Sequence, residues 1–321
     1  KKLFSKHYQP IIPLNNNYYD LSEKDAIENQ IELAKRYRVD GFIFYHYWFG
    51  DDTTALTKPV EILKNQVTKK IDYCFCWANH SWIKNWTGGQ SGMIAQQKYG
   101  AKEEWQKHIE YMIPFFKDER YLKMDGKPVL YIYNMSDIPD FSAMLEVWNA
   151  RLKEEGIPGV YIVEFISSKN RKLSFSKTDA VVEFEPLYTT FFDISKFNLL
   201  KRLITKKLNK IDFQDYNKLW RKIIKRRRTY QGKPIQKGCF CGWDNSARKG
   251  YNCMIVKNNT PENFGKNLDK LINNNRKDST NDIIVINAWN EWSEGAMLEP
   301  TENHKYAYLE QIKEKVEKNR N

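Results

Sequence analysis

Short apolar runs rich in β-forming residues alternate with amphipathic stretches along the chain, and this alternation restricts the fold more than any other feature. The apolar runs cover residues 41–47, 72–77, 129–133, 161–166, 180–184, 237–242 and 283–288. The stretches with helical spacing cover residues 25–38, 58–65, 102–116, 141–155, 261–274 and 304–318. Strands that alternate with helices in this way predict βα units and a parallel sheet.

A single (β/α)8 barrel of the TIM type explains the pattern better than a doubly wound open sheet. Polar and aromatic residues follow nearly every predicted strand, and the loops at that end of the strands carry the active sites of such barrels. The chain has 321 residues, which lies within the range of one barrel. We therefore expect an α/β fold with one catalytic domain over residues 1–321.

The net charge of +12 is concentrated in one segment of the chain. Residues 196–233 combine many Lys and Arg residues with apolar residues at helical spacing, which predicts a basic amphipathic helical insertion. The apolar positions are Leu199, Leu200, Leu203, Ile204, Leu208, Leu219, Trp220, Ile223 and Ile224. Three interpretations stay open: a stripe that packs on the barrel, a peripheral contact with an anionic membrane or a lipid-linked substrate, or a site for an anionic glycan or nucleic acid. No nucleic-acid reading module is recognisable, so we expect no nucleic-acid partner.

Several classes of protein are disfavoured by missing patterns. No apolar run is long enough for a membrane span, and the first residues lack a signal-peptide stretch, so we expect a cytoplasmic protein that can lie at the inner face of the membrane. The pairs Cys74/Cys76 and Cys239/Cys241 lack the two-residue spacing of zinc sites, which favours buried thiols. Dinucleotide, Walker, serine-hydrolase and zinc-protease motifs are absent. We expect no metal and no cofactor.

Two carboxylates stand three residues apart where the last strong strand ends. Glu291 and Glu294 are flanked by Trp289 and Trp292, and Gly295 allows a tight turn. If both carboxyl groups face one cleft, their like charges and the nearby indoles should raise the pKa of one of them, which leaves an acid and a base near neutral pH. Cleavage of a glycosidic bond requires that division of roles. The alternative is that one Glu caps or salt-bridges a neighbouring loop.

Clusters of aromatic and polar residues follow other predicted strands. Such clusters suit sugar subsites, because rings stack on the C–H faces of sugars while polar groups bond the hydroxyls. The predicted substrate-binding residues are Tyr45, His46, Tyr47, Trp48, Trp77, Asn79, His80, Trp82, Tyr131, Glu183, Glu185, Trp243, Asp244, Asn245, Arg248, Trp289, Asn290 and Trp292, with Trp86 close behind. A lone histidine beside a strand is more often structural, so the prediction depends on the clustering.

Motifs spread along most of the chain together resemble the WbsX-like family of bacterial polysaccharide-biosynthesis proteins, which is similar to family 99 glycoside hydrolases. These motifs are HYQP at 7–10, YYDL at 18–21, DGF at 40–42, YHYWF at 45–49, CWAN at 76–79, KPV at 127–129, GWDN at 242–245 and NEWSEG at 290–295. The resemblance implies a (β/α)8 barrel that acts on an oligosaccharide or polysaccharide, commonly in O-antigen or capsule synthesis.

The last motif is similar to the Asn-Glu-Trp-x-Glu-Gly segment of family 99 endo-α-mannosidases and mannanases. That resemblance implies that Glu291 is the base that deprotonates the substrate's own 2-hydroxyl, giving a 1,2-anhydro sugar with retention, and that Glu294 is the acid. Two departures limit it. The loop after the Cys76 strand reads Trp-Ala-Asn-His where those hydrolases carry a glutamate, which implies a different sugar. The family's barrel also begins with a strand upstream of HYQP, so we expect the first strand to be absent from this chain.

Three functions therefore stay open. The first is a retaining glycoside hydrolase or transglycosylase, and the second is a glycosyltransferase that uses a nucleotide sugar. The third is a non-catalytic glycan-binding scaffold tethered by the basic insertion. The chain has no D-x-D triplet of the kind that holds a metal and a nucleotide-sugar diphosphate, which counts against the second.

Overall fold

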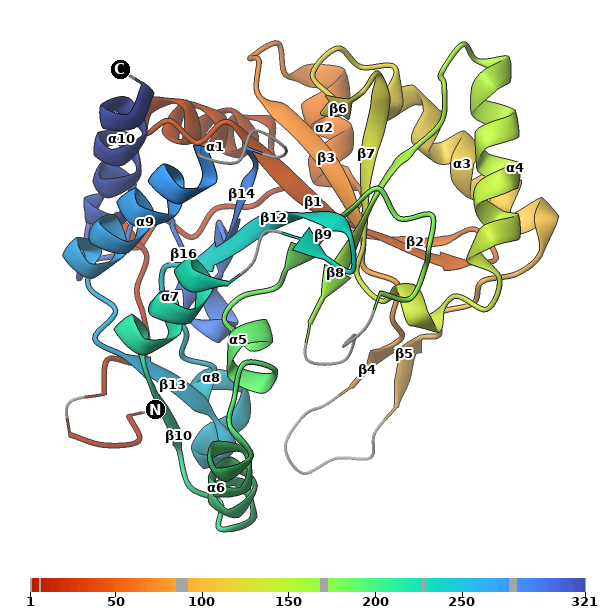
Figure 1. Ribbon diagram of the computed structural model, residues 1–321. Coiled ribbons are helices and arrows are strands. Elements are labelled where there is room, and N and C mark those ends of the chain that lie inside the picture. The colour runs from red at the N-terminus through yellow and green to blue at the C-terminus, as the bar shows by residue number, and fades with distance from the viewer. Residues whose placement is uncertain are drawn as a thin grey trace.

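The computed structural model describes residues 2–5, 7–84, 92–167, 173–226, 229–276 and 282–320, without the side chains of Lys196 and Lys206. Trp86 lies outside the described residues. The fold is mixed α/β. It has one central, mostly parallel sheet, and helices cover the outer side of this sheet (Figure 1).

Seven parallel strands form the centre of the sheet, in the order β14–β12–β9–β8–β7–β3–β1. Their bounds are β1 Gly41–Gly50, β3 Asp72–Trp77, β7 Lys127–Ile132, β8 Tyr161–Ile166, β9 Ala180–Glu183, β12 Lys233–Phe240 and β14 Ile284–Asn287. Short antiparallel strands extend it: β2 Thr53–Ala55, β6 Lys123–Met124 and β11 Thr229–Tyr230. Every strand predicted from the apolar runs is confirmed, with ends that differ by a few residues.

The outer helices also follow the predicted pattern. They are α1 Lys24–Arg36, α2 Lys58–Gln66, α3 Lys102–Phe116, α4 Phe141–Glu154, α9 Pro261–Arg276 and α10 Ala307–Arg320. Shorter elements follow the carboxyl ends of the strands: β4 Trp82–Ile83, β5 Met93–Ala95, α5 Leu187–Phe191, α6 Lys196–Lys207, β10 Asp212–Asp215, α7 Tyr216–Lys225, α8 Ser246–Lys249, β13 Met254–Lys257, β15 Asn290–Glu291 and β16 Ala296–Met297. No helix in the described part of the chain has the length and apolar character that crossing a bilayer requires.

The expectation of a closed eight-stranded barrel is corrected. Among the described residues, β14 pairs only with β12, and β1 pairs only with β3 and the short β2, so no ladder joins the two edges. Side chains meet near this opening instead. The rings of Phe42 and Trp289 lie 5.1 Å apart, and Trp289 Nε1 donates to Gln30 Oε1 at 2.7 Å. The sheet is therefore a barrel wall that stays open between β1 and β14.

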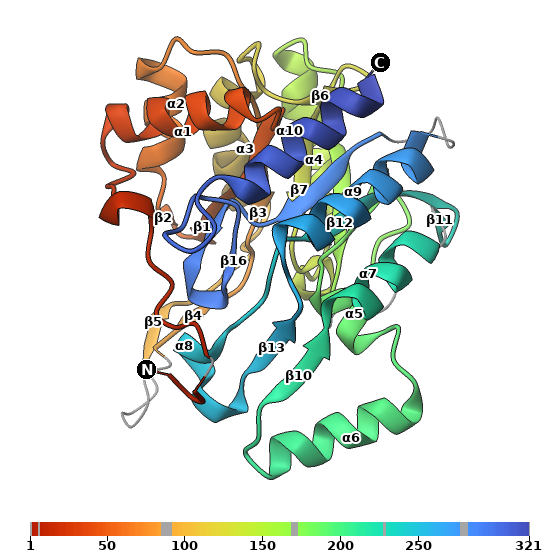
Figure 2. The same ribbon diagram turned by 90° about the vertical axis from the view of Figure 1, so that its left-hand side faces the viewer.

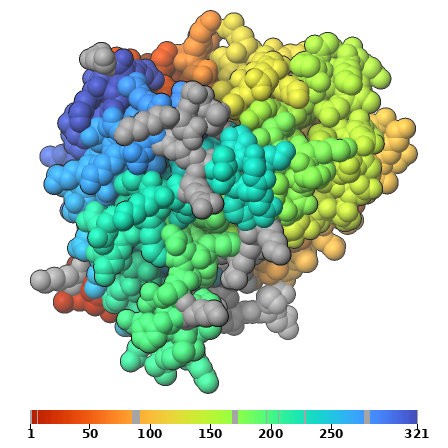
Figure 3. All heavy atoms as spheres, in the orientation of Figure 1, coloured from red at the N-terminus to blue at the C-terminus, as the bar shows by residue number. Residues whose placement is uncertain are grey.

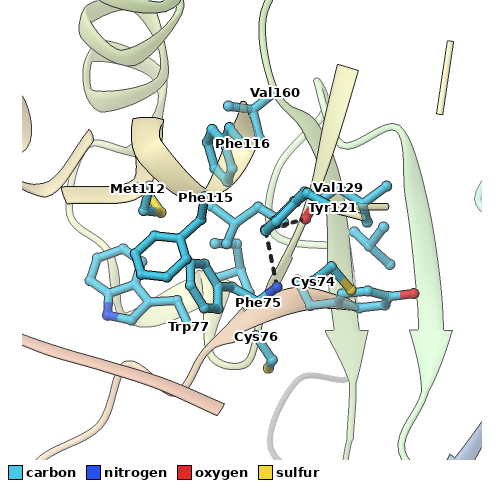
Figure 4. Close-up of a cluster of buried hydrophobic side chains, with 14 of the residues drawn as sticks. Cys74, Phe75, Cys76, Trp77, Met112, Phe115, Phe116, Tyr121, Val129 and Val160 are labelled. Carbon is cyan, nitrogen blue, oxygen red and sulfur yellow. Dashed lines mark hydrogen bonds between the residues drawn. The ribbon is translucent and has the colours of Figure 1, made fainter. Parts of the chain in front are cut away.

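Alternation along β3 shows how the sheet and the helices form the main core. Phe75 faces α3 and packs edge-on against Phe115, with ring centroids 5.0 Å apart. Its backbone N–H donates to the Tyr121 hydroxyl, which donates in turn to the carbonyl of Val129 (Figure 4). This chain of hydrogen bonds joins β3 to β7 through a buried ring.

The basic insertion predicted over 196–233 divides into two helices with different surroundings. Helix α7 packs on the body through Leu219, Trp220 and Ile223, which are all buried. Helix α6 projects from one end of the molecule in both ribbon views (Figures 1 and 2). Packing of the apolar stripe on the barrel is thus confirmed for α7 and wrong for α6.

The close approach of β9 and β12 gives a stability test. A Cβ at Gly238 would lie 1.8 Å from the carbonyl oxygen of Glu183, so the backbone must move to admit any side chain. We expect Gly238→Ala to lower the free energy of unfolding by about 1–3 kcal/mol or more. Urea denaturation measures this. Gly92→Ala, where a Cβ meets nothing within 4 Å, is the matched control and should change little. Equal stability of both variants would contradict this packing.

Candidate active site

The loop after β14 carries both predicted catalytic carboxylates. Asn290 and Glu291 form β15, which pairs with β16, and Trp292–Glu294 form a single 3-10 turn between them. Gly295 closes the turn at a φ of +59°, where an added Cβ would lie 2.9 Å from the backbone nitrogen of Asp244. Only glycine fits that position without strain. The turn thus holds Glu291 and Glu294 on one short hairpin at the carboxyl end of the sheet.

The polar groups of the residues next to the two carboxylates form hydrogen bonds within the protein. Trp292 Nε1 donates to Glu299 Oε2 at 2.6 Å, and the Tyr19 hydroxyl donates to the other oxygen of Glu299 at 2.5 Å. Asn290 Nδ2 donates to the Tyr19 hydroxyl at 3.3 Å. The predicted sugar contacts Asn290 and Trp292 therefore anchor the hairpin to the N-terminal segment, and their polar tips are engaged.

Glu294 is paired with an arginine and still has a raised pKa. Arg248 Nη1 donates to Glu294 Oε1 at 2.8 Å, so the salt bridge to a neighbouring loop, considered above as the alternative, is present. Burial raises the pKa of Glu294 to about 7, the charge of Glu291 adds to the rise, and Arg248 and Lys249 oppose it. The Arg248 side chain is 53% exposed and the Glu294 side chain 21% exposed. Water therefore screens the attraction between Arg248 and Glu294. Burial raises the pKa of Glu294 by more than this attraction lowers it.

Aromatic residues from three strand ends lie beside the two carboxylates. Tyr45 is 6.3 Å from both Tyr47 and Tyr133 between ring centroids, and Tyr47 is 4.9 Å from Trp82. The His80 ring lies 5.6 Å from Tyr133. All five are at least partly exposed to solvent. They form an aromatic wall at the carboxyl ends of β1, β3 and β7.

Electrostatics place the carboxylates next to this wall. Burial raises the pKa of Tyr47 to about 12, and the charge of Glu291 contributes. Burial likewise raises the pKa of Tyr133, with a contribution from Glu294. The Ser293 hydroxyl donates to Glu291 Oε1. The charge of Glu291 thus raises the pKa of Tyr47, and that of Glu294 raises the pKa of Tyr133. Because each carboxylate is close enough to affect a tyrosine of the aromatic wall, the hairpin faces this wall.

Strand alternation puts other predicted contacts on the opposite face of the sheet. His46 and Trp48 are buried against α3, where His46 Nε2 lies 2.9 Å from His108 Nε2 and the Trp48 ring stacks 4.9 Å from His108. Trp77 is 1% exposed, and its Nε1 donates to the carbonyl of Trp48. Asn79 is 0% exposed and bonds Asn134. The prediction that these four residues contact a sugar does not agree with their burial.

Glu183 and Glu185 also lie away from the aromatic wall. Arg226 at the end of α7 reaches both, with Nη1 3.0 Å from Glu183 Oε1 and 2.8 Å from Glu185 Oε1. Lys237 Nζ lies 3.3 Å from Glu183 Oε1, and Thr189 donates to Glu185. Both carboxylates are nearly inaccessible, at 1% and 0%. They fasten the helical insertion to β9 and β12, a role that the sequence did not indicate.

The loop after β12 forms a second boundary of the hairpin. Trp243 is buried, Asp244 Oδ2 lies 2.8 Å from His7 Nε2, and Asn245 Oδ1 accepts from the Met254 N–H at 2.9 Å. A cleft of about 430 Å³ adjoins this loop, and its lining includes Trp243, Asp244 and Gly295 but neither Glu291 nor Glu294. The loop supports the hairpin from behind, since Asp244 N–H donates to the Glu294 carbonyl at 2.7 Å.

One residue of the aromatic wall was missed. Tyr131 was predicted to bind the substrate, but it is 0% exposed. Its hydroxyl donates to Oε1 of Gln236, which lies on β12. Tyr133 stands two residues further along, on the same face and beyond the last residue of β7. A period of two from Tyr131 toward the strand end would have identified it.

A comparison with protein families finds a match to the model described as "Glycosyltransferase WbsX" over residues 1–312. Two curated relatives, both "Uncharacterized protein WxcX" from strains of Xanthomonas campestris pv. campestris, are 27% identical over 314 residues. Those residues are 96% of this chain and 43% of the relatives, so the chain spans less than half of their length.

Solved structures with the same fold include the GH99 endo-α-mannosidase from Bacteroides thetaiotaomicron. It is 16% identical at a TM-score of 0.54, over 97% of this chain and 84% of that one. A glycoside hydrolase-like protein is 14% identical at a TM-score of 0.61, over 96% and 89% of the two chains. These likenesses show a TIM-barrel-like fold.

The raised pKa of Glu294 predicts a pH-dependent cost in stability. Between pH 4.5, the ordinary value, and about 7, the folded protein binds more protons than the unfolded chain, so its free energy of unfolding falls as pH rises. Glu294→Gln removes this cost. We expect the stability of the variant relative to wild type to increase by about 2–3 kcal/mol from pH 5 to pH 8, measured by urea denaturation.

Glu314→Gln is the control for that titration. Glu314 is exposed, and its hydrogen bond with Lys315 lowers the pKa of its carboxyl, so its titration lies below pH 5. The difference between this variant and wild type should stay flat over the same range. A flat difference for Glu294→Gln as well would show that the Glu294 carboxyl titrates like an exposed one.

Proposed function

Because this chain belongs to the Glycosyltransferase WbsX family, we propose that it is a carbohydrate-active enzyme that cleaves or transfers a glycosidic bond with retention of configuration. Glu294 is the acid and Glu291 the base. The observation that carries the proposal is the pKa of about 7 at Glu294, which lies with Glu291 on one hairpin that faces the aromatic wall. A pKa near neutral pH lets part of the Glu294 population keep its proton, as a general acid requires.

The proposed reaction has two steps that return both carboxyl groups to their starting states. In the first, Glu294 gives its proton to the leaving oxygen while Glu291 takes the proton of the sugar's 2-hydroxyl, and that oxygen attacks C1 to form a 1,2-anhydro sugar. In the second, the Glu294 carboxylate takes a proton from water or an acceptor alcohol, which attacks C1. Glu291 then returns its proton to the sugar's O2. Two inversions at C1 give overall retention.

The aromatic wall provides the sugar subsite in this proposal. Tyr45, Tyr47, His80, Trp82 and Tyr133 offer ring faces for stacking, and their polar atoms suit hydroxyl groups. Arg248 has the exposure to leave Glu294 and reach the substrate. The predicted contacts that are buried, among them Trp77 and Asn79, support this surface from below.

The substrate we propose is an oligosaccharide or polysaccharide of the bacterial cell surface, such as O-antigen or capsule. The family supports this, since the resemblance drawn from the HYQP to NEWSEG motifs implies work on such glycans, and the curated relatives come from a bacterium. We propose that the reaction takes place in the cytoplasm at the inner face of the membrane, on a glycan that can be linked to a lipid.

The description of the family favours a second candidate, a glycosyltransferase that uses a nucleotide sugar. The two candidates differ in the donor. Calorimetry with UDP and GDP sugars separates them, because micromolar binding that Glu294→Gln leaves intact would favour the nucleotide-dependent transferase. Turnover of a glycoside without any nucleotide favours the retaining mechanism.

Paired variants test the assignment of acid and base. Glu294→Gln should lower kcat/KM on natural oligosaccharides by about 10²–10⁴-fold, and much less on 4-nitrophenyl glycosides, whose leaving group needs no proton. Glu291→Gln should lower kcat/KM on both kinds of substrate. In the wild type, kcat/KM on oligosaccharides should fall as pH rises above about 7, because Glu294 then loses its proton. The substrates are a panel of bacterial O-antigen and capsule oligosaccharides.

Glu103→Gln, an exposed carboxylate on α3, is the control and should keep full activity. Glycan binding without turnover in the wild type would instead indicate a scaffold. Equal losses of both Glu variants on activated and natural substrates would contradict the separate roles.

A further inference from the structure

Helix α6 displays apolar side chains to solvent, in contrast to α7, the other helix of the insertion. Phe197, Leu200 and Ile204 are 76%, 57% and 50% exposed, and Leu208, one residue past the end of α6, is 58% exposed. Their spacing of three, four and four residues puts them on one face of the helix. A contiguous exposed apolar stripe of this kind marks a surface that meets an apolar partner.

The opposite face of α6 explains why the stripe points outward. Arg202 on that face donates through Nε to Asp212 Oδ2 at 2.6 Å and through Nη1 to the carbonyl of Thr190. Its guanidinium also lies 4.3 Å from the centre of the Phe191 ring. These contacts join α6 to β10 and α5 on its polar side, so the apolar side has no place in the core.

Positive charge surrounds the stripe. Residues 196–226 contain eleven Lys or Arg residues against two Asp, which accounts for nine of the twelve net positive charges of the chain. By helical spacing Lys201 and Lys207 border the stripe on its two sides, and Lys210 follows the helix. None of these three has an ion-pair partner in the part of the chain that the structure describes. An apolar face bordered by unpaired lysines complements an anionic lipid surface.

A second apolar element lies at the same end of the molecule. The β4–β5 hairpin follows β3 as α6 follows β9, so both leave the carboxyl ends of parallel strands, where the Glu291–Glu294 hairpin also lies. Both lie toward the lower end of the two ribbon views, and α6 forms the lowest projection of the space-filling view (Figures 1, 2 and 3). Ile83, Met93 and Ile94 of the hairpin are 51%, 58% and 60% exposed.

We propose that α6 binds the surface of an anionic bilayer, with its apolar stripe in the headgroup region and its lysines on the phosphates, and that the β4–β5 hairpin adds a second contact. This orientation turns the aromatic wall and Glu294 toward the bilayer. The proposal that the active site can reach a glycan carried by a lipid rests on the proposed function. The proposal that α6 contacts the membrane does not depend on that function.

Vesicle flotation of the full chain tests the contact without any activity measurement. At low salt we expect binding to vesicles of phosphatidylcholine with about one-third phosphatidylglycerol, little binding to pure phosphatidylcholine, and release as salt screens the charges. Leu200→Ser with Ile204→Ser should weaken binding by at least about tenfold. Lys201→Glu with Lys207→Glu should weaken it by a similar factor, whereas Lys153→Glu with Lys270→Glu, the same charge change on α4 and α9, should weaken it much less.

Three outcomes would overturn the proposal. Absence of binding to anionic vesicles is the first, and equal loss in the Lys153/Lys270 control is the second, since that would reduce the effect to net charge. The third is a dimer in solution that Leu200→Ser with Ile204→Ser converts to a monomer, which would assign the stripe to contact between two copies. Circular dichroism checks that each variant is folded. We expect folding to be kept, because all the substituted side chains are on the surface.

Discussion

The arrangement depends on one electrostatic constraint, the raised pKa of the Glu294 carboxyl beside Glu291. Burial and the neighbouring carboxylate raise the pKa of Glu294 to about 7 although Arg248 is within hydrogen-bond distance. The hairpin that carries both carboxyl groups is held by close contacts: a Cβ at Gly295 would lie 2.9 Å from Asp244 N, and Glu299 accepts hydrogen bonds from Trp292 and Tyr19. The fold thus keeps two like carboxyl groups in one place, at a cost in stability.

The parallel sheet sorts the chain's aromatic residues into two sets. Along β1, Tyr45 and Tyr47 face the carboxylates while His46 and Trp48 face α3. The buried cluster of Arg226, Glu183 and Glu185 then fixes the helical insertion to the same sheet. Because breaking a buried ion pair leaves an uncompensated charge, this cluster holds the insertion firmly. The one helix of the insertion left with an exposed apolar face is α6.

The helical spacing of apolar residues and the alternation of apolar runs with helical stretches predicted the central strands and outer helices well. Each of these elements has its own pattern of apolar residues in the local sequence. These patterns also identified the Glu291–Glu294 loop, whose turn depends on the adjacent Gly295. What they could not give is the direction of side chains: His46, Trp77 and Glu183 follow the same local pattern as Tyr45, and only pairing with distant elements shows which face is covered. Arg226 lies 41 residues from Glu185, and no spacing rule joins them. The opening between β1 and β14 is likewise a tertiary property.

The most direct measurement is a titration of the Glu294 side-chain carboxyl by ¹³C NMR in the wild type and in Glu291→Gln. The account predicts a pKa of about 7 in the wild type and a clearly lower value in the variant, because the charge of Glu291 is then gone. Burial should keep the variant's value above 4.5, the ordinary one. A wild-type pKa near 4.5, or a raised one that ignores the loss of Glu291, would contradict the coupled pair.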